Sequence, residues 1–143
     1  MEVTVRTPSR LHFAMVDLRG DLGRLYGSVG VAIDRPNIVL KARPATHLAV
    51  EGPSAERAKD YAEKFLKGFG VEGGAEIVMI SEIRAHVGFG SGTQLALAVG
   101  TALSELHELG LTIEEIAKKL ERSRRSGIGT YAFKHGGFIV DGG

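Results

Sequence analysis

The alternation of apolar and polar residues predicts β structure in the first third of the chain. Val3–Thr7 alternates until Pro8, where the predicted strand ends. Further strands, rich in β-branched or alternating residues, are predicted at Arg10–Val16, Val29–Ile33, Ile38–Arg43 and His47–Glu51. The pair Pro36-Asn37 lies between two of these strands and indicates a turn.

The middle of the chain changes to helical spacing. Ser54 can cap a helix that Gly68 and Gly70 end. One face of this helix carries Ala58, Tyr61, Ala62, Phe65, Leu66 and Phe69. A strand is predicted at Ala75–Ile83. The helix that follows buries Leu95, Val99, Ala102, Leu103, Leu106 and Leu109.

The last part of the chain predicts two more helices and a strand. Thr112 and Glu115 have the spacing of a capping box, so a helix is expected from there to about Arg122. The glycine loop Ser126–Gly129 precedes a short helical stretch and a strand at Phe138–Asp141. Because the sequence stops soon after this strand, we expect a longer protein to continue beyond it.

Composition then narrows the classes of protein. The 143 residues are 43% hydrophobic and 24% charged, which is ordinary for one globular domain. The net charge of +1 offers no basic excess for nucleic acid, and no apolar run approaches the length of a membrane span. The first residues lack the pattern of a signal peptide, and cysteine is absent, which excludes thiolate chemistry. We therefore expect a cytoplasmic protein without nucleic-acid or membrane partners.

The 20 glycines are clustered, and one cluster forms a loop between a predicted strand and a predicted helix. Backbone N–H groups and the positive end of a helix dipole together suit a phosphate group. Glycines at this place permit positive φ and close approach of an anion. Ser91 and Thr93 can add hydroxyl groups to phosphate or to bound Mg²⁺, and Ser91 with Gln94 has the spacing of a capping box. The predicted phosphate-binding residues are Gly88, Gly90, Ser91, Gly92 and Thr93.

A tight turn that binds nothing is the alternative interpretation of this loop. A Walker A loop is excluded because no lysine lies between Lys67 and Lys118. A dinucleotide-binding fingerprint is excluded because Thr93 stands where its third glycine belongs and a helix, not a strand ending in an acidic residue, comes next. A polyphosphate or phosphosugar loop of another type remains.

The second glycine loop follows Arg122, Arg124 and Arg125. These arginines either complement a helix dipole in solvent or provide a clamp on phosphate. Two glycine loops at helix starts favour an anionic ligand, and the residues assigned to this second wall are Arg125, Ser126, Gly127 and Gly129.

Three further side chains are candidates for catalysis. Arg10 and His12 are two residues apart on a predicted strand, so they share a face, either as a buried pair or toward a substrate. His86 immediately precedes the first glycine loop.

The segments TPSRLHF, HVGFGSGTQLALAVG and RSGIGTYAFKHGGFIVDGG together resemble the superfamily of galactokinase, homoserine kinase, mevalonate kinase and phosphomevalonate kinase (GHMP). The wording is similar to one branch, the archaeal β-ribofuranosylaminobenzene 5′-phosphate synthases of methanopterin biosynthesis. The resemblance implies the α+β fold of the superfamily's N-terminal domain, a mixed sheet with helices on one side, similar to ribosomal protein S5 domain 2. It covers residues 1–143, and the family's second α/β domain is absent from the chain.

The same resemblance implies a function. Enzymes of that branch join 5-phosphoribosyl-1-pyrophosphate to 4-aminobenzoate or 4-hydroxybenzoate, with loss of pyrophosphate and carbon dioxide, and Mg²⁺ is the expected cofactor, near Ser91 and Thr93. In the kinases an aspartate serves as base at the position that Gly129 occupies here. Glycine takes no proton, so Gly129 favours the synthase. The alternatives are an ATP-dependent kinase and a non-catalytic assembly domain. We expect this chain by itself to be inactive and to form a homo-oligomer.

Overall fold

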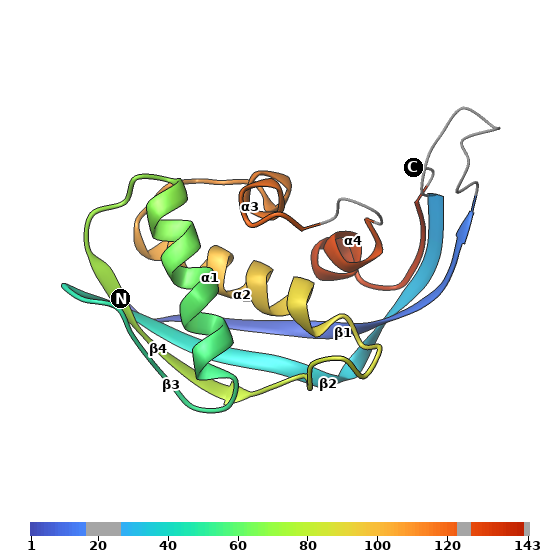
Figure 1. Cartoon of the computed structure of the whole chain (residues 1–143), viewed down its shortest axis with the longest axis horizontal. Coiled ribbons are helices and arrows are strands. Elements are labelled where there is room, and N and C mark those ends of the chain that lie inside the picture. Colours follow the sequence, from blue (N-terminus) through green and yellow to red (C-terminus); the bar gives the residue numbers. More distant parts are fainter. Residues whose placement is uncertain (17–26, 123–126, 142–143) are drawn as a thin grey trace.

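The computed structural model describes residues 1–16, 27–122 and 127–141. Its strands are β1 (Val3–Val16), β2 (Gly27–Ala45), β3 (Ala49–Glu51), β4 (Gly74–Ser81) and β5 (Phe138–Asp141). Its helices are α1 (Ala55–Gly68), α2 (Ser91–Leu106), α3 (Ile113–Lys119) and α4 (Ile128–His135). The four helices lie over one face of the sheet (Figure 1), which confirms the expected α+β class.

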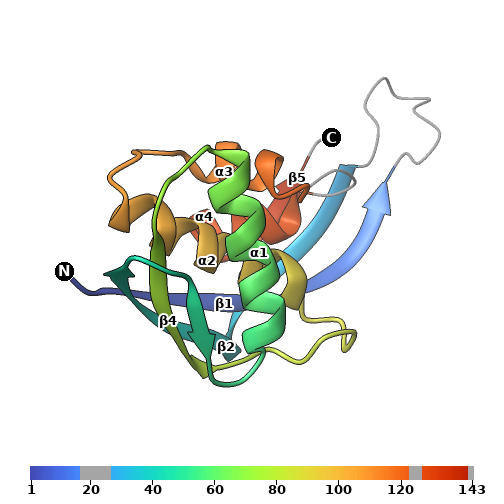
Figure 2. The same ribbon diagram turned by 60° about the vertical axis from the view of Figure 1, so that its left-hand side comes forward.

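The long strand β2 is the centre of the sheet. β1 pairs with it antiparallel along one edge, while the other edge pairs with β4 at residues 39–45 and with β5 at residues 28–31. β3 runs parallel to β4, so the sheet is mixed, as expected. Figure 2 shows β1 and β2 continuing together past the helices as a two-stranded ribbon.

The strand boundaries predicted around the prolines are wrong. β1 is one strand, because Pro8 lies at a bulge in an edge strand, where its missing N–H breaks no ladder bond. β2 is also one strand. Thr7 pairs with Ile38 and Ser9 with Ile33, so residues 34–37 bulge out of the ladder instead of reversing the chain. The hydroxyl group of Ser9 donates to the carbonyl oxygen of Pro36 across this bulge.

The helix boundaries are closer to prediction. α1 begins directly after Ser54, but the Ser54 side chain does not cap it; its hydroxyl group donates to the Glu82 carboxylate instead. The capping box before α3 is confirmed, with the Glu115 amide 3.1 Å from Oγ1 of Thr112. α3 ends at Lys119, earlier than expected, and Arg122 follows it on a turn.

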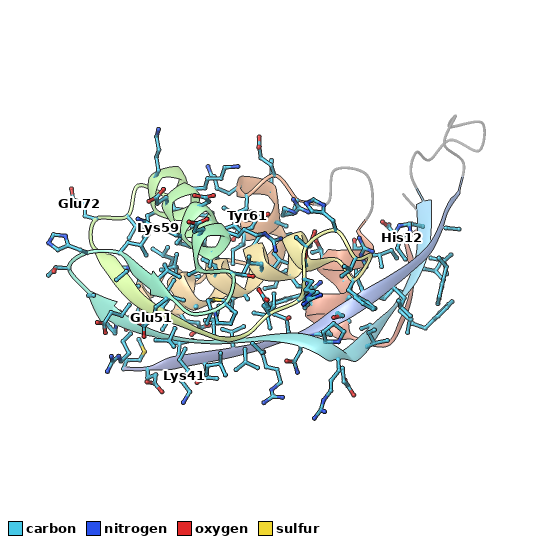
Figure 3. All side chains as sticks on the ribbon, turned by 60° about the horizontal axis from the view of Figure 1, so that its bottom comes forward. His12, Lys41, Glu51, Lys59, Tyr61 and Glu72 are labelled. Carbon is cyan, nitrogen blue, oxygen red and sulfur yellow. The ribbon has the colours of Figure 1, made fainter. Side chains whose placement is uncertain are left out.

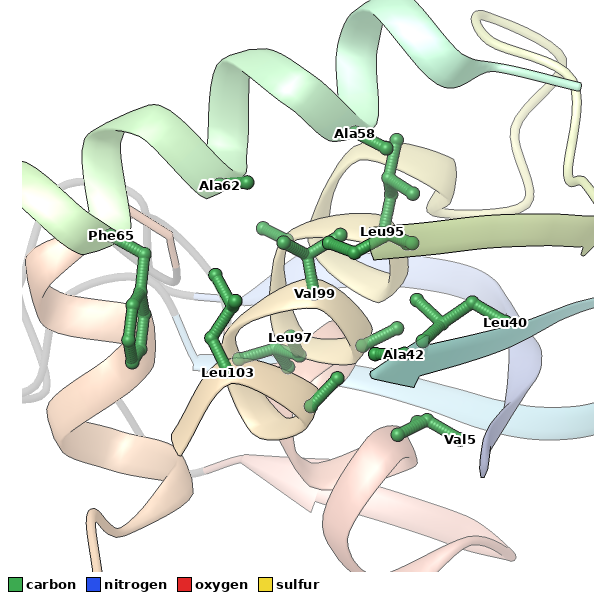
Figure 4. Close-up of a cluster of buried hydrophobic side chains, with 14 of the residues drawn as sticks. Val5, Leu40, Ala42, Ala58, Ala62, Phe65, Leu95, Leu97, Val99 and Leu103 are labelled. Carbon is green, nitrogen blue, oxygen red and sulfur yellow. The ribbon is translucent and has the colours of Figure 1, made fainter. Parts of the chain in front are cut away.

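The core lies between the sheet and α2, which is buried almost all round because α1, α3, α4 and the sheet surround it. Figure 4 shows Ala62 and Phe65 of α1 facing Val99 and Leu103 of α2. Of the residues predicted for the buried side of this helix, Leu95, Val99, Ala102, Leu103 and Leu106 are buried. Leu109 is 36% exposed, because α2 ends before it.

The other face of the sheet has no helix on it, and Lys41 projects from that face away from the helices (Figure 3). The two-stranded end of the sheet exposes the apolar side chains of Phe13, Phe138 and Val140. Self-association through this apolar surface stays a prediction. In the described part of the chain, no helix combines the length and the apolar character that a membrane crossing requires.

Candidate functional site

The loop between β4 and α2 approaches the free edge of β1. The Arg10 amide donates to the carbonyl oxygen of Phe89 at 3.0 Å, and Nη1 of Arg10 lies 3.3 Å from the carbonyl oxygen of Gly88. Gly90 is the N-cap residue of α2, with φ +75°, and it provides no side chain to cap the helix. The first N–H groups of α2 therefore keep the unpaired donors that attract an anion.

Three arginines from separate elements surround this helix start. Arg10 comes from β1, Arg57 from the first turn of α1, and Arg122 from the turn after α3. Nη2 of Arg57 donates to Oγ of Ser91 at 3.2 Å. Nε and Nη2 of Arg122 both donate to Oγ1 of Thr93, at 3.1 and 3.0 Å.

These guanidinium groups are not neutralised within the described residues, where none of them forms an ion pair with a carboxylate. Burial, and then the positive charge of Arg122, lower the pKa of Arg10. The pKa shift shows that the two like charges act on each other in a partly desolvated place. The start of α2 thus carries a concentrated positive charge, which suits a multiply charged anion.

Two of the loop glycines make room for these arginines. A side-chain carbon on Gly90 would lie 2.6 Å from Cγ of Arg10, and one on Gly92 would lie 3.2 Å from Nη2 of Arg122. Beside Gly88, at φ +85°, no atom lies within 4 Å. Space for a ligand was predicted at all three glycines, but the structure leaves it open at Gly88 and fills it with guanidinium side chains at the other two.

The capping box predicted for Ser91 and Gln94 is wrong, because Ser91 is the first residue of the helix and not its cap. Gln94 is fully buried, and its Nε2 donates to the carbonyl oxygen of Gly129 at 2.7 Å. Its Oε1 is buried without a hydrogen-bond partner. Gln94 therefore ties the start of α2 to the start of α4 and brings the two glycine loops together.

Gly129 packs directly against Thr93. A side-chain carbon on Gly129 would lie 2.9 Å from Cγ2 of Thr93 and 3.1 Å from its Cβ. Two carbons need about 3.5–4.0 Å, so the Thr93 side chain occupies the space that a residue larger than glycine would require. The hydrogen bonds from Arg122 hold that side chain in place.

Arg10 and His12 share the helix-facing side of β1, as predicted. Their cross-strand partners, Ala32 and Gly30, both lie against α4. Burial, and then the charge of Arg10, lower the pKa of His12, which favours a neutral imidazole ring.

The remaining predicted residues are spread more widely. His86 is exposed in the loop at φ +61°. Gly127 precedes α4, and its amide donates to Oδ2 of Asp141 at 2.8 Å. Arg125 and Ser126 lie outside the described residues.

The oxygen atoms expected to hold Mg²⁺ are already engaged. Both acceptor positions of the Thr93 hydroxyl group face Arg122, and one of those on Ser91 faces Arg57. Within residues 1–16, 27–122 and 127–141, no three His, Cys, Asp or Glu side chains gather where they could hold a metal ion. Ser91 and Thr93 therefore do not fit this ion in the arrangement described. A requirement for Mg²⁺ in a reaction stays a prediction.

Sequence reasoning missed Arg57 and undervalued Arg122. Arg57 lies in a helix predicted for its apolar face, and nothing near it in the sequence points to the glycine loop. Arg57 and Tyr61 also line a surface groove of about 510 Å³ along α1, together with Asp60, Glu63, Lys64 and Lys67. This groove leads from the start of α2 along a helix with further cations.

Comparison with known proteins agrees with this geometry. Residues 56–137 match the family described as "GHMP kinases N terminal domain". A protein of Archaeoglobus fulgidus named beta-ribofuranosylphenol 5'-phosphate synthase is 46% identical over 141 residues, which cover 97% of this chain and 44% of that protein. A protein of the same name from Methanocaldococcus jannaschii is 36% identical over 153 residues, covering 97% of this chain and 46% of its own length. The chain thus spans less than half the length of these curated relatives.

Among solved structures, the mevalonate kinase of Methanococcus jannaschii superimposes with a TM-score of 0.69 at 17% identity. The superposition covers 98% of this chain and 53% of the kinase. At that identity the similarity supports the fold, whereas the function has to be argued from the site.

Proposed function

The chain belongs to the family of GHMP kinase N-terminal domains, and from that premise we propose that it forms the phosphate-binding part of a ribosyltransferase. The proposed reaction joins 5-phosphoribosyl-1-pyrophosphate to 4-hydroxybenzoate or 4-aminobenzoate. It releases pyrophosphate and carbon dioxide. The names of the archaeal relatives support this family of reactions over phosphotransfer.

The contact between Gly129 and Thr93 is the observation that carries the proposal. A kinase of this superfamily needs a carboxylate base at the position of Gly129, and here Thr93 fills the space for such a side chain. Thr93 is no substitute base, because both acceptor positions of its hydroxyl group face the Arg122 guanidinium. The site is therefore poorly suited to taking a proton from an alcohol.

Ribosyl transfer to an aromatic carbon needs no such base. The ring carbon that carries the carboxylate attacks C1 of the ribose, and the C1–oxygen bond breaks with its electron pair leaving on pyrophosphate. The bond to the carboxylate then breaks, its electron pair restores the aromatic ring, and carbon dioxide leaves. The positive groups at the start of α2 would stabilise the charge that develops on pyrophosphate. Arg10 and His12 would bind an acidic group, either the benzoate carboxylate or the ribose 5-phosphate.

The test is release of labelled carbon dioxide from carboxyl-labelled 4-hydroxybenzoate in the presence of 5-phosphoribosyl-1-pyrophosphate. The protein to assay carries this chain together with the remaining length found in its relatives. We expect release there and none from the 143 residues by themselves. Phosphorylation of an alcohol by ATP without such release would support the kinase alternative instead, and turnover by the isolated chain would contradict the expected inactivity.

A further inference from the structure

The donor and acceptor pattern around α2 reaches beyond the proposed function, on which this inference rests. Three arginines contact the first turn of α2 or the loop before it, and each comes from a different element. The hydroxyl oxygen of Thr93 accepts two hydrogen bonds from one guanidinium group, at 3.1 and 3.0 Å. A hydroxyl group has two acceptor positions and one donor hydrogen. Thr93 is left as a donor, and a donor hydrogen binds an anion but not a metal ion.

Ser91 leads to the same conclusion. Its hydroxyl oxygen accepts from Nη2 of Arg57 at 3.2 Å, and the residue is 7% exposed. A divalent cation bound to Ser91 and Thr93 would lie next to two guanidinium groups that already contact those oxygens. Mg²⁺ sites in proteins use carboxylates beside the substrate phosphates, and no described carboxylate pairs with these arginines.

We infer that this site binds a diphosphate group directly through Arg10, Arg57 and Arg122, without a metal ion held by the protein. The three positive charges match the several negative charges of a diphosphate, and the unpaired amides at the start of α2 add donors. Arg122 also fixes Thr93, so that its hydroxyl hydrogen points away from the guanidinium group and toward an anion. Any Mg²⁺ in the reaction then arrives on the substrate.

The test is calorimetric titration of the 143-residue chain with inorganic pyrophosphate, once with EDTA and once with Mg²⁺. We expect binding in EDTA with an affinity at least equal to that measured with Mg²⁺. Substitution R122Q or R57Q should weaken binding by roughly 10–100-fold in both solutions, since each removes a charge-assisted hydrogen-bond donor. The lysine variant R122K should fall between, because it keeps the charge but loses the forked donors.

The matched control is R6Q, which removes an exposed arginine from the same strand as Arg10 and should leave binding unchanged. Thermal unfolding of each variant checks that the fold is retained. Thr93→Val distinguishes the two modes. A metal-ligating Thr93 would make T93V weaken the Mg²⁺ titration selectively, whereas the inferred mode predicts an equal loss in both.

Binding that disappears in EDTA, or affinities that R122Q and R57Q leave unchanged, would overturn the inference. Its failure is separable from failure of the proposed function. Carbon dioxide release by the longer protein, together with pyrophosphate binding that needs Mg²⁺, refutes the arginine mode and keeps the transferase. Metal-free binding without any transferase activity does the reverse.

Discussion

Substitution of Gly129 by alanine tests the packing between the two glycine loops. The added methyl group would lie 2.9 Å from Cγ2 of Thr93, where about 3.5–4.0 Å is comfortable. Overpacking of this kind costs about 1–3 kcal/mol. The higher helix propensity of alanine returns at most about 1 kcal/mol. We therefore expect G129A to lower the free energy of unfolding by about 1–2 kcal/mol.

The assay is a double-mutant cycle with T93S, measured by urea unfolding. Serine lacks Cγ2, the atom that the new methyl group approaches most closely, and keeps the hydroxyl group that Arg122 binds. The double variant should recover at least about 1 kcal/mol relative to the sum of the two single changes. In thermal unfolding, G129A by itself should lower the midpoint by roughly 3–8 °C.

G88A is the matched control for the backbone contribution of alanine at a glycine site. At φ +85° it strains the chain by about 1 kcal/mol, and with no atom within 4 Å it should show no coupling to Thr93. An unchanged or increased stability of G129A, or the absence of coupling with T93S, would refute the packing argument and with it the main structural argument against the kinase.

Other changes test the remaining parts of the site and fold. Gln94→Ala leaves a cavity and an unpaired Gly129 carbonyl group, so it should lower the free energy of unfolding by about 2–4 kcal/mol in urea, whereas Q94M keeps the volume, removes the unpaired Oε1 and should cost less than about 1.5 kcal/mol. Thr112→Ala removes the capping box of α3 and should cost about 1 kcal/mol, with T112S as the conservative control. The lowered pKa of His12 means that the unfolded chain binds its proton more readily, so this residue's contribution to stability is present above pH 6.5 and is lost as the pH falls below it; H12N should flatten that slope in urea titrations from pH 7.5 to 5. A slope that H12N leaves unaltered would contradict the assignment to His12.

Local patterns were sufficient for most helices and for the final strand. Apolar spacing placed α1, and the capping-box spacing of Thr112 and Glu115 marked the start of α3. They failed at Pro8 and at residues 34–37, where pairing between β1 and β2 on both sides keeps the chain extended through a bulge. Proline reports the loss of one N–H group, but whether the chain turns or bulges depends on a strand that is distant in sequence.

The site divides in the same way. The sequence determined that a glycine-rich segment opens a helix and that Gly129 replaces a carboxylate, because both depend on which residues follow one another along the chain. The tertiary structure decided that Arg10, Arg57 and Arg122 meet at the start of α2, and that Gln94 reaches α4 instead of capping its own helix. Those contacts join residues 29 to 78 positions apart, and no local pattern fixes such distances. They exist because a single core packs β1, α1, α3 and α4 around one buried helix.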